Sequence, residues 1–351
     1  MKYICHLIAI VASFVLLLAA YGGRVNPMEW TLPSIATLAL PVIAMIAIVL
    51  LALLALFRQW RSVAVIVGAL LLSWPTLRLI SPFNLSHPDA DPDKVQLKLL
   101  SINVQEFNWF DGNTEPNKTM RYILDQDADI VAIQEATVYF TFEQLKPIKP
   151  MLEELYKKYP YRKDGYYDVG ILSKYPISPV ESPVLAQDSL SYFIKAWDVD
   201  APGGELRVVN MHLSSLRFSG NDTRILDSMN KPSGRKQRAQ SVLKKLSDGF
   251  RSHTRLSEAI RELLNVTTGD VLVMGDMNDT PGSYAYRTIC GEDMRDSWAD
   301  VGFGPIYTFH DHHLYVKIDH ILYRGGMKVL SSRRDKEGES DHYPLVAVFE
   351  R

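Results

Sequence analysis

Three long stretches without a Lys, Arg, Asp or Glu residue lie within the first 80 residues and limit what this end of the chain can become. They cover residues 4–20, 32–57 and 62–77. A helix needs about 20 apolar residues to cross a bilayer, so the second stretch is long enough and the other two are marginal. We predict an N-terminal bundle of three transmembrane helices within residues 1–80, at about 4–20, 34–57 and 62–80.

The first stretch could instead be a cleaved signal peptide. Lys2 precedes an apolar run that ends in Ala19 and Ala20, which is also the pattern of such a peptide.

The short loop between the second and third stretches indicates the orientation in the membrane. The loop from Arg58 to Arg61 carries two positive charges, and loops of this kind stay in the cytoplasm. We therefore predict an integral protein of a bacterial inner membrane, with the domain after the last helix on the extracytoplasmic side.

The remainder of the chain reads as one soluble domain. Residues 81–94 are polar and punctuated by proline, which favours an extended linker. Residues 95–351 have the length of one large α/β domain. The two cysteines, Cys5 and Cys290, are too few for a disulfide scaffold or a thiolate zinc site.

Short apolar runs typical of buried strands recur along this domain, and most of them end in a polar residue. One such residue alone commonly caps a helix or closes a turn. Together they supply many oxygen ligands and no cysteine, which suits a hard cation such as Mg²⁺ or Mn²⁺. A histidine beside an aspartate suits proton transfer with water. The pattern therefore favours hydrolysis of a phosphate ester. The polar residues are Asn103, Glu135, His212, Asp276, Asn278, Asp319, Asp341 and His342.

Seven segments in a fixed order carry a resemblance to a known family. They are Ser101–Asn103, Ile133–Glu135, Gly170–Ile177, Val209–Leu213, Gly275–Asn278, Ile318–Leu322 and Ser340–Pro344. Together they resemble the endonuclease/exonuclease/phosphatase superfamily, which includes DNase I, abasic-site endonucleases, neutral sphingomyelinases, inositol polyphosphate 5-phosphatases and deadenylases. The resemblance implies an α/β fold, a four-layer α-β-β-α sandwich of two mixed sheets with the site at one edge. It also implies a metal-dependent hydrolase.

The resemblance also assigns roles. Glu135 is expected to be the main metal ligand with Asn103 as its neighbour, and Asp341 is expected to bind the metal directly or through water. Asp276 and Asn278 would orient the nucleophilic water and hold phosphoryl oxygens. The imidazole of His212 would donate a hydrogen bond to a phosphoryl oxygen. His342 would act with Asp319, either as base or as transition-state donor.

Two positions depart from the family pattern. Gln105 stands where abasic-site endonucleases carry an acid, and Asp168 replaces a small residue. Tyr166 or Tyr167 could line the site. We leave these positions out of the predicted site.

Two features bear on the substrate. Residues 216–261 hold eleven basic and four acidic residues, which suits a nucleic-acid backbone, anionic lipid or merely a solvated helix face. His310, His312 and His313 could bind zinc, but adjacent ligands without cysteine favour a loop near the site.

The function we predict is a membrane-tethered, divalent-metal-dependent phosphoesterase that acts on a lipid-linked phosphate. Tethering favours it, because a domain held at the bilayer meets lipid head groups at high effective concentration. The alternatives are a membrane-anchored nuclease acting on DNA or RNA, and a catalytically dead binding module. The expected partners are the phosphate ester, as lipid head group or nucleic acid, and the bilayer itself; no protein partner is implied.

Overall fold

The computed structural model describes residues 2–86, 88–107, 117–136, 149–163, 168–186, 190, 192–216, 235–311, 314–336 and 339–351. Its contacts divide the chain into two compact units. One, the helical unit, comprises residues 1–81, 215–255 and 279–288. The other, the sheet unit, comprises residues 82–214, 256–278 and 289–351. Neither unit is a single continuous segment, because α9 and α10 each contribute to both.

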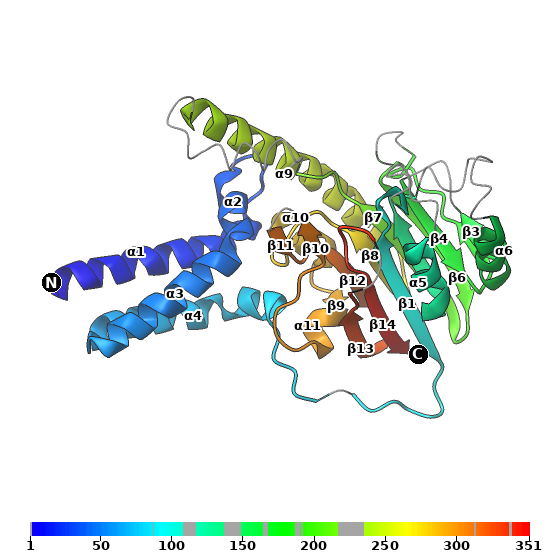
Figure 1. The fold of residues 1–351 in the computed structure, drawn as a ribbon, viewed down its shortest axis with the longest axis horizontal. Helices are drawn as coiled ribbons and strands as arrows, with labels where there is room; N and C mark the ends of the chain where they lie inside the picture. The colour runs from blue at the N-terminus through cyan, green and yellow to red at the C-terminus, as the bar shows by residue number, and fades with distance from the viewer. Residues whose placement is uncertain are drawn as a thin grey trace. The chain divides into compact units, whose positions relative to one another are not determined.

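Four apolar helices and a short 3₁₀ turn, η1, begin the helical unit (Figure 1). They are α1 (Lys2–Tyr21), η1 (Gly22–Arg24), α2 (Leu32–Leu38), α3 (Leu40–Leu56) and α4 (Trp60–Ile80). Two helical segments, Lys2–Arg24 and Trp60–Ile80, are long and apolar enough to cross a membrane, and α2 with α3 would make a third span if the pair is counted as one. That pair is bent by 65°, and Pro41 at the start of α3 explains the break because proline supplies no backbone N–H.

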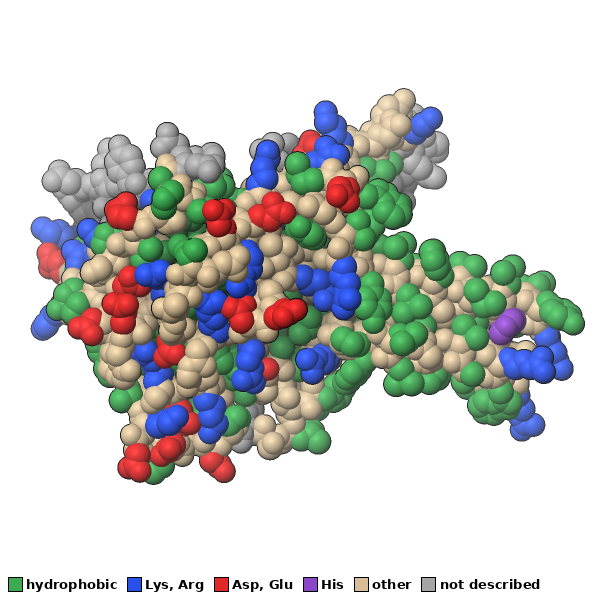
Figure 2. Space-filling model, turned by 180° about the vertical axis from the view of Figure 1, so that it is seen from behind, with side chains coloured by type: hydrophobic (Ala, Val, Ile, Leu, Met, Phe, Trp, Pro, Cys, Tyr) green, Lys and Arg blue, Asp and Glu red, His purple; other side chains and the backbone are tan. Residues whose placement is uncertain are grey.

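Small and hydroxyl-bearing residues make many of the contacts between these helices. Ala9, Ala19 and Ala20 are fully buried, whereas large apolar side chains such as Leu7 and Leu71 are exposed. The Thr37 hydroxyl donates to the carbonyl of Ala19 across the helix interface, as expected for helices packed in lipid. Figure 2 shows mainly hydrophobic side chains along the middle of these helices, with a group of Lys and Arg side chains at the end of the helices on the right of the view.

The sheet unit contains two six-stranded mixed sheets. The first has the strand order β13-β14-β1-β2-β4-β3 and the second β5-β6-β7-β8-β12-β9. Each sheet has one parallel pair, β1 with β2 and β7 with β8. Strands β10 and β11 form a separate hairpin. The strands are β1 (Gln96–Asn103), β2 (Ile130–Gln134), β3 (Tyr161–Lys163), β4 (Val169–Ser173), β5 (Ile177–Pro179), β6 (Ile194–Ala201), β7 (Gly204–His212), β8 (Val271–Asp276), β9 (Arg295–Asp296), β10 (Phe309–Asp311), β11 (Leu314–Val316), β12 (Asp319–Arg324), β13 (Lys328–Arg334) and β14 (Leu345–Glu350).

The two sheets pack face to face around a core that draws on both, including Leu99 of β1 and Val208 of β7. The remaining helices are α5 (Lys118–Gln126), α6 (Lys149–Lys158), α9 (Arg235–Asn265), α10 (Tyr284–Cys290) and α11 (Ser297–Val301). Helices α5 and α6 cover the first sheet through an apolar cluster with β1 and β2. Arg324 of β12 donates to the carbonyl of Leu264, which ties the end of α9 to the second sheet. The predicted α/β sandwich is confirmed.

Candidate active site

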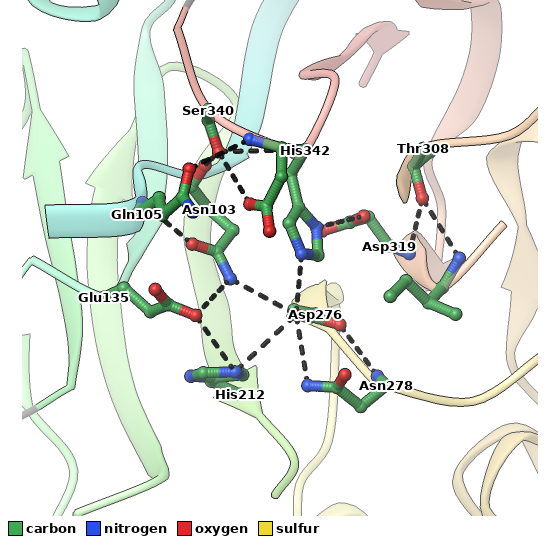
Figure 3. Close-up of polar contacts among 12 residues, drawn as sticks. Asn103, Gln105, Glu135, His212, Asp276, Asn278, Thr308, Asp319, Ser340 and His342 are labelled. Atoms are coloured by element: carbon green, nitrogen blue, oxygen red, sulfur yellow. Dashed lines mark hydrogen bonds and ion pairs between the residues drawn. The ribbon is translucent and has the colours of Figure 1, made fainter. Parts of the chain in front are cut away.

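The parallel strand pairs bring the predicted site residues together. Asn103 ends β1 and Glu135 directly follows β2, while His212 and Asp276 end β7 and β8 in register with each other. Asp319 begins β12 opposite Asp276. Because the carboxyl ends of parallel neighbours meet at one sheet edge, residues far apart in sequence converge there. Figure 3 shows these side chains pointing toward a common centre.

One carboxylate oxygen, Oδ2 of Asp276, lies at that centre. It accepts hydrogen bonds from the side-chain amides of Asn103 at 3.3 Å and of Asn278 at 3.2 Å. The Nε2 atoms of His212 and His342 each lie 3.6 Å from it. Asp276 is fully buried. Four nitrogen-bearing side chains from four segments therefore surround one buried oxygen.

Each histidine is oriented by a second carboxylate. Nδ1 of His342 lies 3.0 Å from Oδ2 of Asp319, and Nδ1 of His212 hydrogen-bonds Oδ2 of Asp168. The site thus holds two His–Asp pairs whose free Nε2 atoms face the same aspartate. The His342–Asp319 pair was predicted from the sequence, and Asp168 was left out.

Burial and charge set the protonation of this cluster. Burial opposes the charged imidazole, but the charges of Asp319 and Asp276 prevail and raise the pKa of His342 to about 10. For His212, burial is likewise outweighed, by the bond to Asp168 and the charge of Asp276, and its pKa rises to about 9. Burial raises the pKa of Asp276 to about 6, against the neighbouring imidazolium of His342. Burial of Asp319 is outweighed by the charge of His342, so its pKa lies below the ordinary value.

Glu135 forms the more open side of the site. Its side chain is 32% exposed, and Oε1 accepts from the Asn103 amide at 2.9 Å and lies 3.8 Å from Nε2 of His212. Glu135 and Asn278 both adopt a positive φ, +55° and +51°. A left-handed backbone is unfavourable for glutamate, so the turn after β2 is held in place by the structure around it.

The donor set fits a hard divalent cation. Glu106 lies near the carboxylates of Glu135 and Asp168, and burial together with these two charges raises its pKa. Three carboxylates therefore lie close together beside the site. Oδ1 of Asp319 is a buried acceptor with no hydrogen-bond partner among the described residues. Asp276, Asp319 and His342 offer ligand atoms within 4.8 Å of one another. Oxygen-rich sites of this kind suit Mg²⁺ or Mn²⁺.

Asp341 lies beside this cluster. Its backbone N–H donates to the Gln105 side chain at 3.1 Å, and its charge helps to raise the pKa of His342. Ser340 fastens the same loop, because its hydroxyl donates to the carbonyl of Asn103 at 2.8 Å. Sequence reasoning gave no role to Ser340, which begins one of the motifs that it used, or to Glu106, which lies three residues after another.

Several expectations fall outside the described residues. These are the tyrosines Tyr166 and Tyr167, the histidines His312 and His313, and residues 217–234 of the basic stretch. His310 is described, and its ring stacks on Tyr343 at a centroid distance of 3.9 Å.

Comparison with known protein families identifies the family of this chain. The profile of the endonuclease/exonuclease/phosphatase family matches residues 100–342. The chain belongs to that family. It is therefore an enzyme that acts on phosphate ester bonds, and its site residues fit the divalent metals that the family generally uses. A second profile, described as a domain of unknown function, matches residues 2–80.

The fold also resembles solved structures at low sequence identity. An AP endonuclease from Archaeoglobus fulgidus is 18% identical over 72% of this chain and 99% of its own, with a TM-score of 0.49. An endonuclease/exonuclease/phosphatase family protein from Leptotrichia buccalis is 18% identical over 73% and 100%, with a TM-score of 0.46. Another from Bacteroides thetaiotaomicron is 15% identical over 76% and 96%, with a TM-score of 0.44. No curated protein matches the chain in sequence.

Proposed function

We propose that the protein is a membrane-tethered, divalent-metal-dependent phosphoesterase that hydrolyses a lipid-linked phosphate ester by attack of water. The observation that carries the chemistry is the Asp276 oxygen surrounded by two oriented histidines and two amides. The observation that supports a lipid substrate is the pair of helices able to cross a membrane within the same chain.

The roles follow from the contacts. Glu135 and Asn103, with Asp341 nearby, would hold the divalent ion, which when bound neutralises phosphoryl charge and lowers the pKa of a bound water. The carboxylate of Asp276 accepts hydrogen bonds from the site amides and so suits the orientation of a water molecule. Asn278 fixes that carboxylate, because its backbone N–H donates to Oδ1 of Asp276 at 2.8 Å.

The two histidines would act on the phosphoryl group. His212, held by Asp168, suits donation to a phosphoryl oxygen as charge develops there. Loss of one such preorganised donor costs about a hundredfold to a thousandfold in kcat. His342, held by Asp319, suits donation in the same way, because its raised pKa favours the protonated imidazole.

The second candidate is a nuclease anchored in the membrane. It is favoured by exposed basic side chains along α9, namely Lys236, Lys244, Arg251 and Arg255. Their spacing places them along one side of the helix, where they could follow a phosphate backbone.

Turnover by the full-length protein in detergent micelles separates these candidates. The substrates are plasmid DNA, RNA, phospholipid, sphingomyelin and polyprenyl pyrophosphate, each with Mg²⁺, with Mn²⁺ and with chelator. We expect metal-dependent release from a lipid substrate that is lost in His342→Ala and retained in Asp125→Asn, an exposed position on α5. Cleavage of nucleic acid alone would favour the nuclease, and activity that survives both chelator and His342→Ala would contradict the proposed site.

A further inference from the structure

The chain that leaves the active site passes directly into the helical unit. Asp276 ends β8 and Asn278 follows it, and the next ten residues, Asp279–Thr288, cluster with the N-terminal helices. Only three residues separate Asn278 from Gly282. A shift of Gly282 is therefore transmitted through a very short segment to both site residues.

Backbone contacts hold this segment, residues 279–288, against the ends of α1 and α4. A Cβ atom on Gly23, just after α1, would lie 2.0 Å from the carbonyl oxygen of Gly282. A Cβ atom on Gly282 would lie 2.5 Å from Cγ2 of Thr76 in α4. The φ angle of Gly23 is not positive, so its backbone conformation does not require glycine. Glycine is required at this position because the backbone of Gly282 approaches it closely.

Hydrogen bonds join the same three elements. The guanidinium of Arg287 donates to the Thr76 hydroxyl at 2.7 Å and to the carbonyl of Gly282 at 2.9 Å. The Thr76 hydroxyl in turn donates to the carbonyl of Ala20 at 2.8 Å. Thr76 is 1% exposed. One buried hydroxyl thus links α1, α4 and the segment that follows the site.

The part of α9 that belongs to the helical unit contacts the same segment. Nδ1 of the buried His253 lies 3.4 Å from Oδ2 of Asp279, and Oδ1 of Asp279 accepts from the backbone N–H of Thr280 at 2.9 Å. The first residue after Asn278 is therefore also fixed by the helical unit.

We propose that Gly23, Thr76 and Arg287 are positioning residues for the catalytic turn Asp276–Asn278, because they hold the segment that continues directly from it. The membrane helices would then fix the chain that leaves this turn as well as anchor the protein. This inference rests on the proposed function, because the turn is catalytic only if the site hydrolyses a phosphate ester. It gives residues 1–80 a second role that tethering alone does not require.

Gly23→Ala tests the contact, with Gly68→Ala as the matched control. Gly68 lies inside α4, and a Cβ atom there would meet nothing within 4 Å. In the full-length protein we expect Gly23→Ala to lower kcat by about a hundredfold, the cost of a small misplacement of catalytic groups, with KM and thermal midpoint close to wild type. Gly68→Ala should retain the kcat of wild type. Equal kcat in the two variants would overturn the inference.

Thr76 supplies a second pair of variants in case Gly23→Ala does not fold. Thr76→Val keeps the shape and loses the hydroxyl, whereas Thr76→Ser keeps the hydroxyl that bonds Arg287 and Ala20. We expect the valine variant to lose kcat and the serine variant to retain most of it. If both variants behave alike, the hydroxyl does not position the turn.

Hydrogen exchange of residues 277–287 gives a readout that does not depend on activity. We expect faster exchange there in Gly23→Ala than in wild type or Gly68→Ala. The backbone N–H of Asn278 donates to Oδ1 of Asp276, and that of Ser283 donates to the carbonyl of Thr280. A displaced segment would weaken these hydrogen bonds, and the two amides would exchange faster. Unchanged exchange overturns the inference. Wild-type protein without turnover on any substrate would instead count against the proposed function, and the exchange comparison would still decide whether Gly23 holds the turn.

Discussion

At the scale of single residues, the site is built from paired groups rather than isolated ones. His212 and His342 are alike in burial and in the distance of their Nε2 atoms from Asp276, and each is held by its own aspartate. The second aspartate, Asp168, precedes β4 and lies 44 positions from its histidine. Such a pair forms only when β4 and β7 are folded, which is why the sequence offered no signal for it.

Replacement of Asp168 tests the second pair. Asp168→Asn keeps the shape of the side chain but removes the charge that holds His212. We expect kcat to fall, by less than the roughly hundredfold to thousandfold loss expected for His212→Ala, because the imidazole is still present but poorly oriented.

The control for this prediction is Asp198→Asn. Asp198 pairs with Arg207 in the second sheet and touches none of the site residues. Steady-state kinetics on the best substrate should show no loss of kcat in the control. Wild-type kcat in Asp168→Asn would show that His212 needs no carboxylate partner.

At the scale of secondary structure, local patterns predicted the type of an element better than its continuity. The apolar stretch 32–57 was the strongest predicted span, yet it divides into α2 and α3 at Ala39, just before Pro41. Conversely, α9 continues without a break through Gly249. This glycine packs against Leu216, and the tertiary contact accommodates a residue that otherwise weakens helices.

A buried charge cluster stabilises the elements beside the site. Asp296 caps α11 through the backbone N–H of Trp298 and lies 2.9 Å from Nζ of Lys317, with both side chains nearly inaccessible. We expect Asp296→Asn to lower the free energy of unfolding by about 3–5 kcal/mol, because it leaves a buried lysine without its counter-charge. Denaturant titration of the full-length protein measures this loss.

The control is Asp293→Asn, since Asp293 is 40% exposed and solvent screens its pairs with Arg261 and Arg324. Its effect should stay below about 1 kcal/mol. A similarly small loss in Asp296→Asn would mean that the buried cluster contributes no more than a surface pair.

The same two aspartates predict how stability depends on pH. Hydrogen bonds from Arg261 and Arg324 lower the pKa of Asp293 to about 2 from 3.8, and the charge of Lys317 overcomes burial and lowers the pKa of Asp296 as well. A carboxyl with a lowered folded-state pKa stabilises the fold above its unfolded pKa and loses that contribution as pH falls through the folded value. We expect the thermal midpoint to fall between pH 4 and pH 2, and to fall less steeply in the double variant of Asp293→Asn and Asp296→Asn. If the thermal midpoints of wild type and the double variant fall equally with pH, Asp293 and Asp296 are not the cause of the acid sensitivity.

At the scale of the whole molecule, each of the two units is made of three separate segments of the chain. The helical unit also includes residues 215–255 and 279–288, which lie within the region that the family profile matches. We therefore propose that the intact protein, rather than a fragment beginning near residue 88, is the form in which activity should be measured.

Orientation in the membrane is a prediction at this scale. Lys2 lies at the start of α1, Arg58 follows the end of α3 and Arg61 lies at the start of α4. Basic residues of this kind stay in the cytoplasm. With three spans, we expect a reporter fused after Arg351 to be active only outside the cytoplasm. A reporter active only in the cytoplasm would contradict this prediction. Either the opposite orientation or an even number of spans would then place the C-terminus in the cytoplasm.

The sequence by itself determined the family, the apolar helices and the residues that meet at the sheet edge, because each depends on residue type or local order along the chain. Strand-end positions such as Asn103 and Asp276 could be recognised from short motifs. Only the tertiary structure decided that Asp168 orients His212, that Asp276 Oδ2 is the shared centre, and that Gly23 and Thr76 contact the segment after Asn278. These features join residues tens to hundreds of positions apart, and such contacts depend on how strands and helices pack rather than on any local pattern.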